Sequence, residues 1–293
     1  MRVSGSKPTL LAVVAHPDDE SFGIGGTLAR YVAEGWDVHV VVMTDGVAGS
    51  VAEGFEVTLA DLVAVRQKEL ETAVAILGVR LHTLGYRDSG YVNDPANEHP
   101  DAFIQAAQDE VVGRLVTLMR QIRPQVVLTH DEMGNYFHPD HIYCCTTTTL
   151  AFHAAGDAAQ YPAAGPAYQP ERLYYTAFSN RWVKFFTFML RLRGEDPTKM
   201  GRNKDVDMTQ LGVPPQRIHV VIDYGAYWDV KKAASAAHSS QGGGTPLTRF
   251  LPEWVLRRFL AKETYIRAHP ATSDGYRVYD LGRPALAVMN EVN

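Results

Sequence analysis

One stretch near the start of the chain constrains its fold more than any other. Residues 9–15 form a short apolar run typical of a buried strand, and this run stops at His-Pro-Asp-Asp-Glu, residues 16–20. Pro17 favours extended backbone before it and lacks an N–H for further pairing, so the strand should end here. Ligands bind at the carboxyl ends of strands in open parallel sheets. His16 and Asp19, one turn apart, are therefore candidate metal ligands, and a solvated acidic loop is the alternative.

Strand and helix patterns alternate along the rest of the chain. The segments expected as further strands are 38–43, 79–84, 126–129, 173–176 and 218–222. Those expected as helices are 23–35, 61–77, 101–122, the stretch after residue 138, 226–240 and 252–266. Such alternation implies parallel strands joined by right-handed crossovers. We therefore expect an α/β fold with a Rossmann-like, mostly parallel sheet flanked by helices and a C-terminal α+β elaboration.

Composition and charge exclude several classes of function. The chain has 28 Lys and Arg against 33 Asp and Glu, a formal charge of −5, without long runs of like charge. Nucleic-acid binding is not expected, because it would need a basic stripe. No apolar stretch approaches the ~20 residues of a transmembrane segment, and the first strand leaves no room for a signal peptide. These features predict a cytoplasmic protein. The adjacent Cys144 and Cys145 are expected in the core rather than in a disulfide.

The glycines after the first strand resemble the start of a dinucleotide-binding fingerprint. Residues 23–26 read Gly-Ile-Gly-Gly, and Asp45 lies near the place of a ribose-binding acid. Leu28, however, stands at the third glycine position. Carboxylates in the preceding turn would also repel a pyrophosphate by an energy on the order of several kcal/mol. We therefore expect these glycines to let the helix start lie close to the sheet.

A second polar cluster follows the strand predicted at 126–129. His138 and Pro139 open a helix, with proline in the first turn where its missing N–H is harmless. His141 lies three residues further on, so the two histidines share a helix face. With the histidine and aspartate of the first turn, either one would complete a three-ligand site with open positions, as in catalytic zinc centres. The other would remain for acid or electrostatic work.

Together the two clusters resemble the signature of the zinc-dependent N-acetylglucosamine (GlcNAc) deacetylases. The matching stretches are Ala-His-Pro-Asp-Asp-Glu at 15–20 and His-Pro-Asp-His at 138–141. This family includes phosphatidylinositol-GlcNAc de-N-acetylases and the deacetylases of mycothiol and bacillithiol biosynthesis. The resemblance covers residues 9–150. Beyond them, only His-Ser-Ser-Gln at 238–241 is similar to a family element.

By position, the resemblance implies three metal ligands, His16, Asp19 and His141. Zn²⁺ is the implied metal, and Fe²⁺ is compatible with the same ligands. Asp18 is implied as the general base that takes a proton from the attacking water. His138 would stabilise the oxyanion and protonate the leaving amine, while Asp140 would hydrogen-bond the ring of His138 and hold it in place.

Further residues match positions around the substrate. Tyr136 matches a tyrosine that polarises the acetamide carbonyl in some members. Arg66 and Asp88 match positions that contact sugar hydroxyls, the alternatives being a helix-surface charge and an ordinary turn acid. His238 is a third candidate substrate contact, with packing or capping as the alternative. Glu20 is interpreted as buried support for the first turn.

The predicted activity is removal of the N-acetyl group from a small GlcNAc conjugate, with bacillithiol-type thiol biosynthesis as one candidate pathway. Thiol-conjugate amidases share these motifs but often carry a lysine shortly after the acidic motif, where residues 21–23 read Ser-Phe-Gly. That difference favours a deacetylase. A non-haem iron oxygenase is another hypothesis, although its first ligands are usually spaced His-x-Asp on a β-barrel. A non-catalytic sugar-binding protein would be favoured if Asp18 or His138 were missing, and both are present.

The loop at 155–170, rich in Ala, Gly and Pro, is the best internal boundary. We expect residues 1–155 to form the catalytic core that carries both metal motifs. Residues 156–293 would be an elaboration of the same domain, completing the sheet and the substrate pocket. Residues 181–193 are aromatic and basic, and they are interpreted as a lid, a subunit contact or a membrane-surface helix. A homo-oligomer is compatible with the sequence.

Overall fold

A seven-stranded sheet forms the centre of the computed structural model, which describes residues 7–200, 206–243 and 252–282. The strands are β1 (Thr9–Val14), β2 (Asp37–Thr44), β3 (Arg80–Tyr86), β4 (Val126–Thr129), β5 (Arg172–Ala177), β6 (Val220–Asp223) and β7 (Lys262–His269). Their order in the sheet is β3-β2-β1-β4-β5-β7-β6. The first five strands pair in parallel, whereas β7 is antiparallel to both neighbours. The mostly parallel α/β fold expected from the sequence is confirmed.

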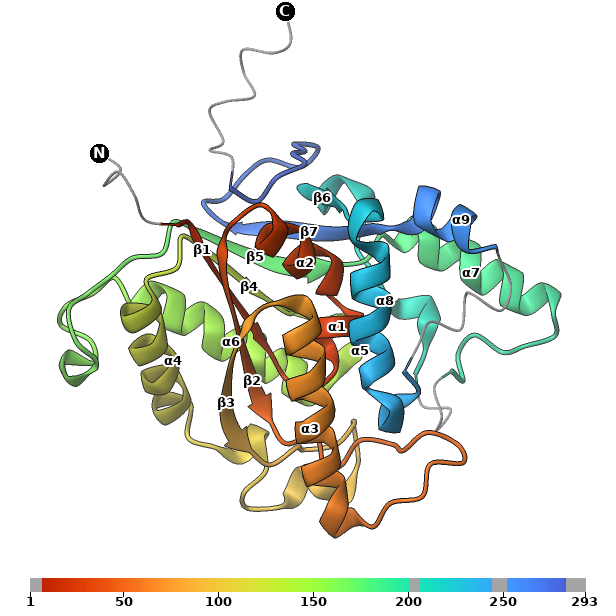
Figure 1. Cartoon of the computed structure of the whole chain (residues 1–293), viewed down its shortest axis with the longest axis horizontal. Helices are drawn as coiled ribbons and strands as arrows, with labels where there is room; N and C mark the ends of the chain where they lie inside the picture. The colour runs from red at the N-terminus through yellow and green to blue at the C-terminus, as the bar shows by residue number, and fades with distance from the viewer. Residues whose placement is uncertain (1–6, 201–205, 244–251, 283–293) are drawn as a thin grey trace, which may run out of the picture.

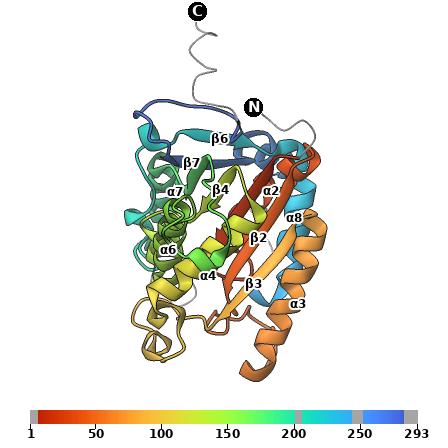
Figure 2. The ribbon, with the colours of Figure 1, turned by 90° about the vertical axis from the view of Figure 1, so that its left-hand side faces the viewer.

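Helices cover both faces of this sheet (Figure 1). The described α-helices are α1 (Asp19–Phe22), α2 (Gly25–Ala33), α3 (Leu59–Leu77), α4 (Gln108–Ile122), α5 (Gly134–Phe137), α6 (Pro139–Ala154), α7 (Asn180–Leu192), α8 (Trp228–Ala237) and α9 (Glu253–Val255). Figure 2 shows α3 and α8 on one side of the sheet and α4 and α6 on the other. Within the described ranges, no helix has the length and apolar character needed to cross a bilayer.

The alternation of side chains along β1 divides the core into two layers. Leu11 points to one face and packs in a cluster with Phe152 of α6, while Leu10 points to the other and packs in a cluster with Leu70 of α3. All four side chains are fully buried. A strand covered on both faces reads as a continuous apolar run, which is why β1 shows no polar alternation.

The strand order places the two polar motifs side by side. From β1 the chain builds β2 and β3 on one side, then returns to add β4 and β5 on the other. The order therefore reverses between β1 and β4, and ligands of such sheets bind at the carboxyl ends of the strands beside this point. The acidic turn follows β1 directly, and the loop leading to α6 follows β4.

Two helix predictions were wrong in part. Residues 252–266 were expected as one helix, but only 253–260 are helical, ending in a π-turn (Leu256–Leu260), and Lys262–His269 is β7. Pairing with β5 and β6 decides this, because β-branched and aromatic residues such as Thr264 and Tyr265 suit a strand once partners exist. Residues 101–107 were expected to begin the helix at 101–122, but they form a loop with one short 3₁₀ helix (Phe103–Gln105), and Phe103 is fully buried in the core.

The glycines that resemble a dinucleotide fingerprint serve packing instead. A Cβ at Gly26 would lie 2.2 Å from the ring of Tyr224, so only glycine fits this approach. The first free amides of α2, on Gly26 and Thr27, donate to the two carboxylate oxygens of Glu263 at 3.0 and 2.7 Å. The helix N-terminus that would hold a pyrophosphate is thus occupied by a carboxylate of this chain.

Candidate metal centre and active site

The acidic turn after β1 has a strained backbone at the first of its two aspartates. Asp18 has φ 130° and ψ −27°, a combination disfavoured for any residue with a side chain. The N–H of His16 donates to Asp19 Oδ2 at 2.8 Å, and the N–H of Asp18 donates to Glu20 Oε2 at 2.9 Å. Glu20 is fully buried, as expected for a residue that supports the turn.

Three potential ligand atoms converge between this turn and the start of α6. His16 Nδ1 lies 3.1 Å from His141 Nε2. Asp19 Oδ2 lies 3.5 Å from the first of these nitrogens and 3.4 Å from the second. A tetrahedral zinc ion with bonds of about 2.05 Å requires ligand atoms about 3.3 Å apart. The three donors therefore have the spacing that a zinc ion would require.

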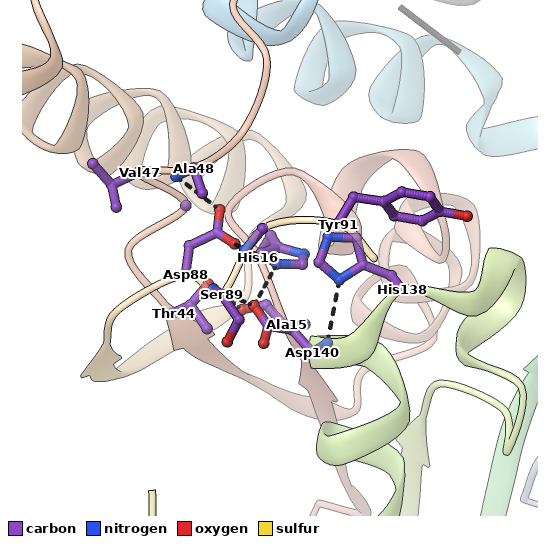
Figure 3. A network of polar contacts seen from close by, with 12 residues as sticks. Ala15, His16, Thr44, Val47, Ala48, Asp88, Ser89, Tyr91, His138 and Asp140 are labelled. Atoms are coloured by element: carbon purple, nitrogen blue, oxygen red, sulfur yellow. Dashed lines mark hydrogen bonds and ion pairs between the residues drawn. The ribbon is translucent and has the colours of Figure 1, made fainter. Parts of the chain in front are cut away.

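Carboxylates hold the second ring nitrogen of His16 (Figure 3). His16 Nε2 lies 3.2 Å from Asp140 Oδ2 and 3.5 Å from Asp88 Oδ1. The same Asp140 oxygen accepts from the N–H of Ser89 at 2.9 Å. Such partners fix the tautomer and orientation of a metal-binding histidine. Asp140, expected to hold the ring of His138, thus pairs its carboxylate with His16, and only its backbone N–H donates to His138 Nδ1, at 3.2 Å.

His130 is part of this cluster, although the sequence motifs did not predict a role for it. It follows β4 directly, the same signal that singled out His16 after β1. Its Nε2 accepts from the N–H of Ala15 at 3.0 Å, and its Nδ1 lies 2.9 Å from Asn135 Oδ1. Its ring stacks on that of His141 with 3.8 Å between centroids. Because both ring nitrogens have partners, His130 supports the orientation of His141 and is a poorer ligand than its neighbour.

His138 and Tyr136 form the wall beside the three ligand atoms. The two rings meet edge to face at 5.7 Å between centroids. Burial, reinforced by the nearby His16 and His141, lowers the pKa of His138 to about 2, so the ring is neutral. Burial also raises the pKa of Tyr136 above its ordinary value, so its hydroxyl keeps the proton and can donate it in a hydrogen bond.

Arg66 connects α3 to the acidic turn. Its guanidinium, only 2% exposed, donates to the carbonyls of Gly46 and Pro17 at 2.5 Å each and to Asp18 Oδ2 at 3.0 Å. The alternative of an ordinary helix-surface charge is therefore wrong. Gly46 has φ +70°, and a Cβ there would lie 2.5 Å from the guanidinium carbon. Burial raises the pKa of Asp18 to about 7, with the charge of Arg66 opposing this rise.

An open pocket lies over these groups and carries an excess of acids. Its described lining includes the carboxylates of Asp18, Asp88 and Asp94, together with Tyr91 and Gln241. The only Lys or Arg among the described lining residues is the arginine of α3, whose guanidinium is already bonded to the turn. Two of the expected substrate contacts, the arginine and Asp88, thus reach the pocket wall.

His238 lies behind the turn, away from the pocket lining. Its Nε2 is 2.7 Å from Glu20 Oε1, and both side chains are fully buried. The next two residues hydrogen-bond to Glu69 of α3. Ser239 donates through its hydroxyl at 2.8 Å, and Ser240 donates through its N–H and its hydroxyl at 2.7 and 2.6 Å. The place of His238 therefore agrees with the packing alternative and differs from a substrate contact. Only Gln241 of this His-Ser-Ser-Gln element lines the pocket.

Comparison with known proteins identifies the family. A family model described as GlcNAc-PI de-N-acetylase (PIG-L) matches residues 11–152. The 1D-myo-inositol 2-acetamido-2-deoxy-alpha-D-glucopyranoside deacetylase of Geodermatophilus obscurus is 36% identical over 284 residues, which cover 91% of this chain and 95% of that protein. This chain belongs to the GlcNAc-PI de-N-acetylase family. The resemblance inferred from two short motifs is confirmed, and the similarity continues past residue 150.

Other relatives and structural neighbours are named for several different reactions. The mycothiol S-conjugate amidase of Streptomyces coelicolor is 43% identical over 180 residues, 59% of this chain and 61% of that protein. The N,N'-diacetylchitobiose deacetylase of Pyrococcus horikoshii has a TM-score of 0.59 at 19% identity, covering 88% of this chain and 83% of its own. GalB, a 4-carboxy-2-hydroxymuconate hydratase from Pseudomonas putida, has a TM-score of 0.60 at 17% identity, covering 91% and 98%. These structures establish a shared fold, and the hydratase shows that the fold does not decide the reaction.

Proposed function

We propose that this protein is a zinc-dependent hydrolase that removes the N-acetyl group from GlcNAc linked to a neutral polyol. The observation that carries this proposal is the convergence of His16 Nδ1, Asp19 Oδ2 and His141 Nε2 within 3.1–3.5 Å of one another. Family membership supports an acetamide as the bond that is cleaved. When bound, zinc would polarise the acetamide carbonyl and make an attacking water more acidic.

The residues of the chain divide the remaining work. Asp18 lines the pocket, is oriented by Arg66, and accepts a proton from the attacking water. His138 Nδ1 accepts from a backbone N–H, so the neutral ring carries its proton on Nε2. That N–H can donate a hydrogen bond to the developing oxyanion. The proton that Asp18 takes from the water then passes to the leaving amine, a role that the family resemblance implied for His138. Tyr136, whose hydroxyl stays protonated, can donate a second hydrogen bond to the oxyanion. The products are acetate and the free amine of the sugar.

The charge of the pocket supports a neutral aglycone. Three carboxylates line it, and the one described guanidinium of the lining is already bonded within the chain. An anionic aglycone such as malate would meet these carboxylates without a free cation among the lining residues that the structure describes, whereas polyol hydroxyls can donate to the carboxylates. The relative from Geodermatophilus obscurus acts, by its name, on a 1D-myo-inositol conjugate. We therefore propose inositol-like polyols as the aglycone, in place of a substrate of the bacillithiol-type pathway considered from the sequence.

The test combines metal analysis with release of free amine. Purified protein should contain about one zinc per chain, and it should release amine from GlcNAc-inositol far faster than from GlcNAc-malate, in a chelator-sensitive reaction. Cleavage of a mycothiol S-conjugate in preference to GlcNAc-inositol would instead favour the amidase activity of the Streptomyces relative. Protein that binds no zinc and releases no amine from any of these conjugates would refute the proposal.

Matched variants separate ligands from catalytic groups. His141→Ala should lose zinc, whereas His138→Asn and Asp18→Asn should keep it and lose most turnover. Loss of zinc from the His138 variant would show that His138 is the third ligand. For the aglycone, Asp94→Asn should narrow the preference for inositol over malate conjugates. Asp101→Asn, at an exposed acid outside the pocket, is its control.

A further inference from the structure

Helix α7 presents a broad apolar face to solvent. Five of its large apolar side chains are exposed, at fractions of 37–66%, and these are Trp182, Phe185, Phe188, Met189 and Leu192. Phe178, just before the helix, is 50% exposed. Together they leave on the order of 500 Å² of apolar surface, which is at the upper end for a monomeric protein.

These side chains form one continuous face. At 100° per residue, the five exposed side chains of the helix fall within roughly one third of its circumference. The opposite side carries Val183 and Thr187, which line a groove with Thr209–Gly212 and anchor the helix to the protein. The apolar face therefore points directly away from the body of the protein.

The charged residues of α7 and its C-cap are all positive, and the acids Glu195 and Asp196 follow after the helix. Residues 180–193 contain Arg181, Lys184, Arg191 and Arg193 and no acid, although the whole chain has a formal charge of −5. All four cationic residues are exposed. Lys184 and Arg191 lie between one margin of the apolar face and the groove, which they also line, and Arg193 lies at the other margin. A helix with Trp, Phe and Leu on one face and cations beside it matches the physical requirements of a helix lying in a membrane interface.

The other occupants considered for this helix agree less well with the structure. The described lining of the catalytic pocket contains no residue of α7, so the helix is not a closed lid. A second copy of the helix in a symmetric contact would bring four cations against four cations without any acid of the same segment. An anionic surface complements both the apolar face and its charges.

We propose that α7 docks this protein on the surface of a bilayer that contains anionic lipid. The aromatic face enters the boundary between headgroups and acyl chains, while the flanking lysine and arginines contact lipid phosphates. Docking leaves the acidic pocket on the protein body free for a water-soluble substrate. The contact is peripheral and reversible, because its affinity depends on exposed charges that salt screens.

The test is sedimentation of the full chain with vesicles of phosphatidylcholine alone or mixed with phosphatidylglycerol. We expect binding to the mixed vesicles at low salt and its loss at high salt. The double variant Lys184→Gln/Arg191→Gln should bind about 25-fold more weakly, since each surface cation contributes about fivefold. Phe185→Ser/Phe188→Ser should bind at least tenfold more weakly. Leu150→Ser, at a 41% exposed leucine of α6, should bind like the wild type.

Three outcomes would overturn the proposal. One is absence of binding to anionic vesicles at low salt, and another is equal binding to both vesicle types. The third is a dimer in light scattering that the phenylalanine variant abolishes, which would assign the face to a second copy. Amine release from a soluble substrate should be unchanged in the α7 variants, so a failed docking test and a failed hydrolase test remain distinguishable.

Discussion

Removing the imidazole of His238 tests whether a buried ion pair behind the active site holds the catalytic turn. Both His238 and Glu20 are fully buried, with 2.7 Å between Nε2 and Oε1. The other carboxylate oxygen of Glu20 accepts the N–H of Asp18, whose φ is 130°. His238→Ala should therefore affect both folding stability and the position of the base.

The expected magnitude follows from burial. Breaking a buried pair by removing one partner costs about 3 kcal/mol, because the other charge stays buried. A chain of this size should then melt about 6–10 °C lower. Release of the strained turn should lower kcat by up to about 100-fold, since small displacements of a reacting group are costly. Zinc content should be unchanged, because the hydrogen bonds that the structure describes for Glu20 and His238 involve none of the three ligand atoms.

The stability that His238 contributes should depend on pH in a definite direction. Burial lowers the pKa of His238, but its hydrogen bond and ion pair with Glu20 outweigh this and raise it above 6.5. The stabilisation is therefore fully present below pH 6.5 and is lost as the pH rises through the raised value. The difference in free energy of unfolding between wild type and His238→Gln should shrink between pH 6 and pH 9.

Denaturant unfolding at several pH values, with kcat and zinc content measured in parallel, is the assay. His219 provides a matched control, because it is a buried histidine outside the site whose pKa burial lowers. The contribution of His219 to the free energy of unfolding should change with pH in the opposite direction. It should be present above pH 6.5 and be lost as the pH falls. A His238→Ala variant with wild-type stability and wild-type kcat would refute the reasoning.

Three further changes have definite expected outcomes. Asp140→Asn should weaken zinc binding about 10- to 100-fold in chelator competition, since Asp140 orients His16. Gly46→Ala should cost about 1–3 kcal/mol in denaturant unfolding, because Gly46 has φ +70°, where an alanine is strained. It should also lower kcat, because the added Cβ would displace the guanidinium of Arg66. Glu263→Gln should cost about 1.5–3 kcal/mol, because its carboxylate holds the α2 N-terminus, and it should leave kcat unchanged. An unchanged kcat in Gly46→Ala, or an altered kcat in Glu263→Gln, would contradict the arrangement described.

The sequence alone determined the parts of the site that are local. An apolar run that stops at ionisable residues indicated β1 and its turn, because a buried strand and its polar end differ clearly in amino-acid composition. The spacing of His138 and His141 in a first helical turn predicted their shared face. The family resemblance then assigned roles to these residues, and membership in the family is confirmed.

Tertiary structure decided what depends on partners distant in the chain. Lys262–His269 is a strand because β5 and β6 provide neighbours for it, although its local pattern permitted a helix. The Asp140 carboxylate pairs with the ring of His16, 124 residues away, and the ring of His238 pairs with Glu20, 218 residues away. A sequence pattern records which groups are polar, but burial leaves each such group to satisfy its hydrogen bonds with whatever the fold brings near. That pairing exists only in the folded protein.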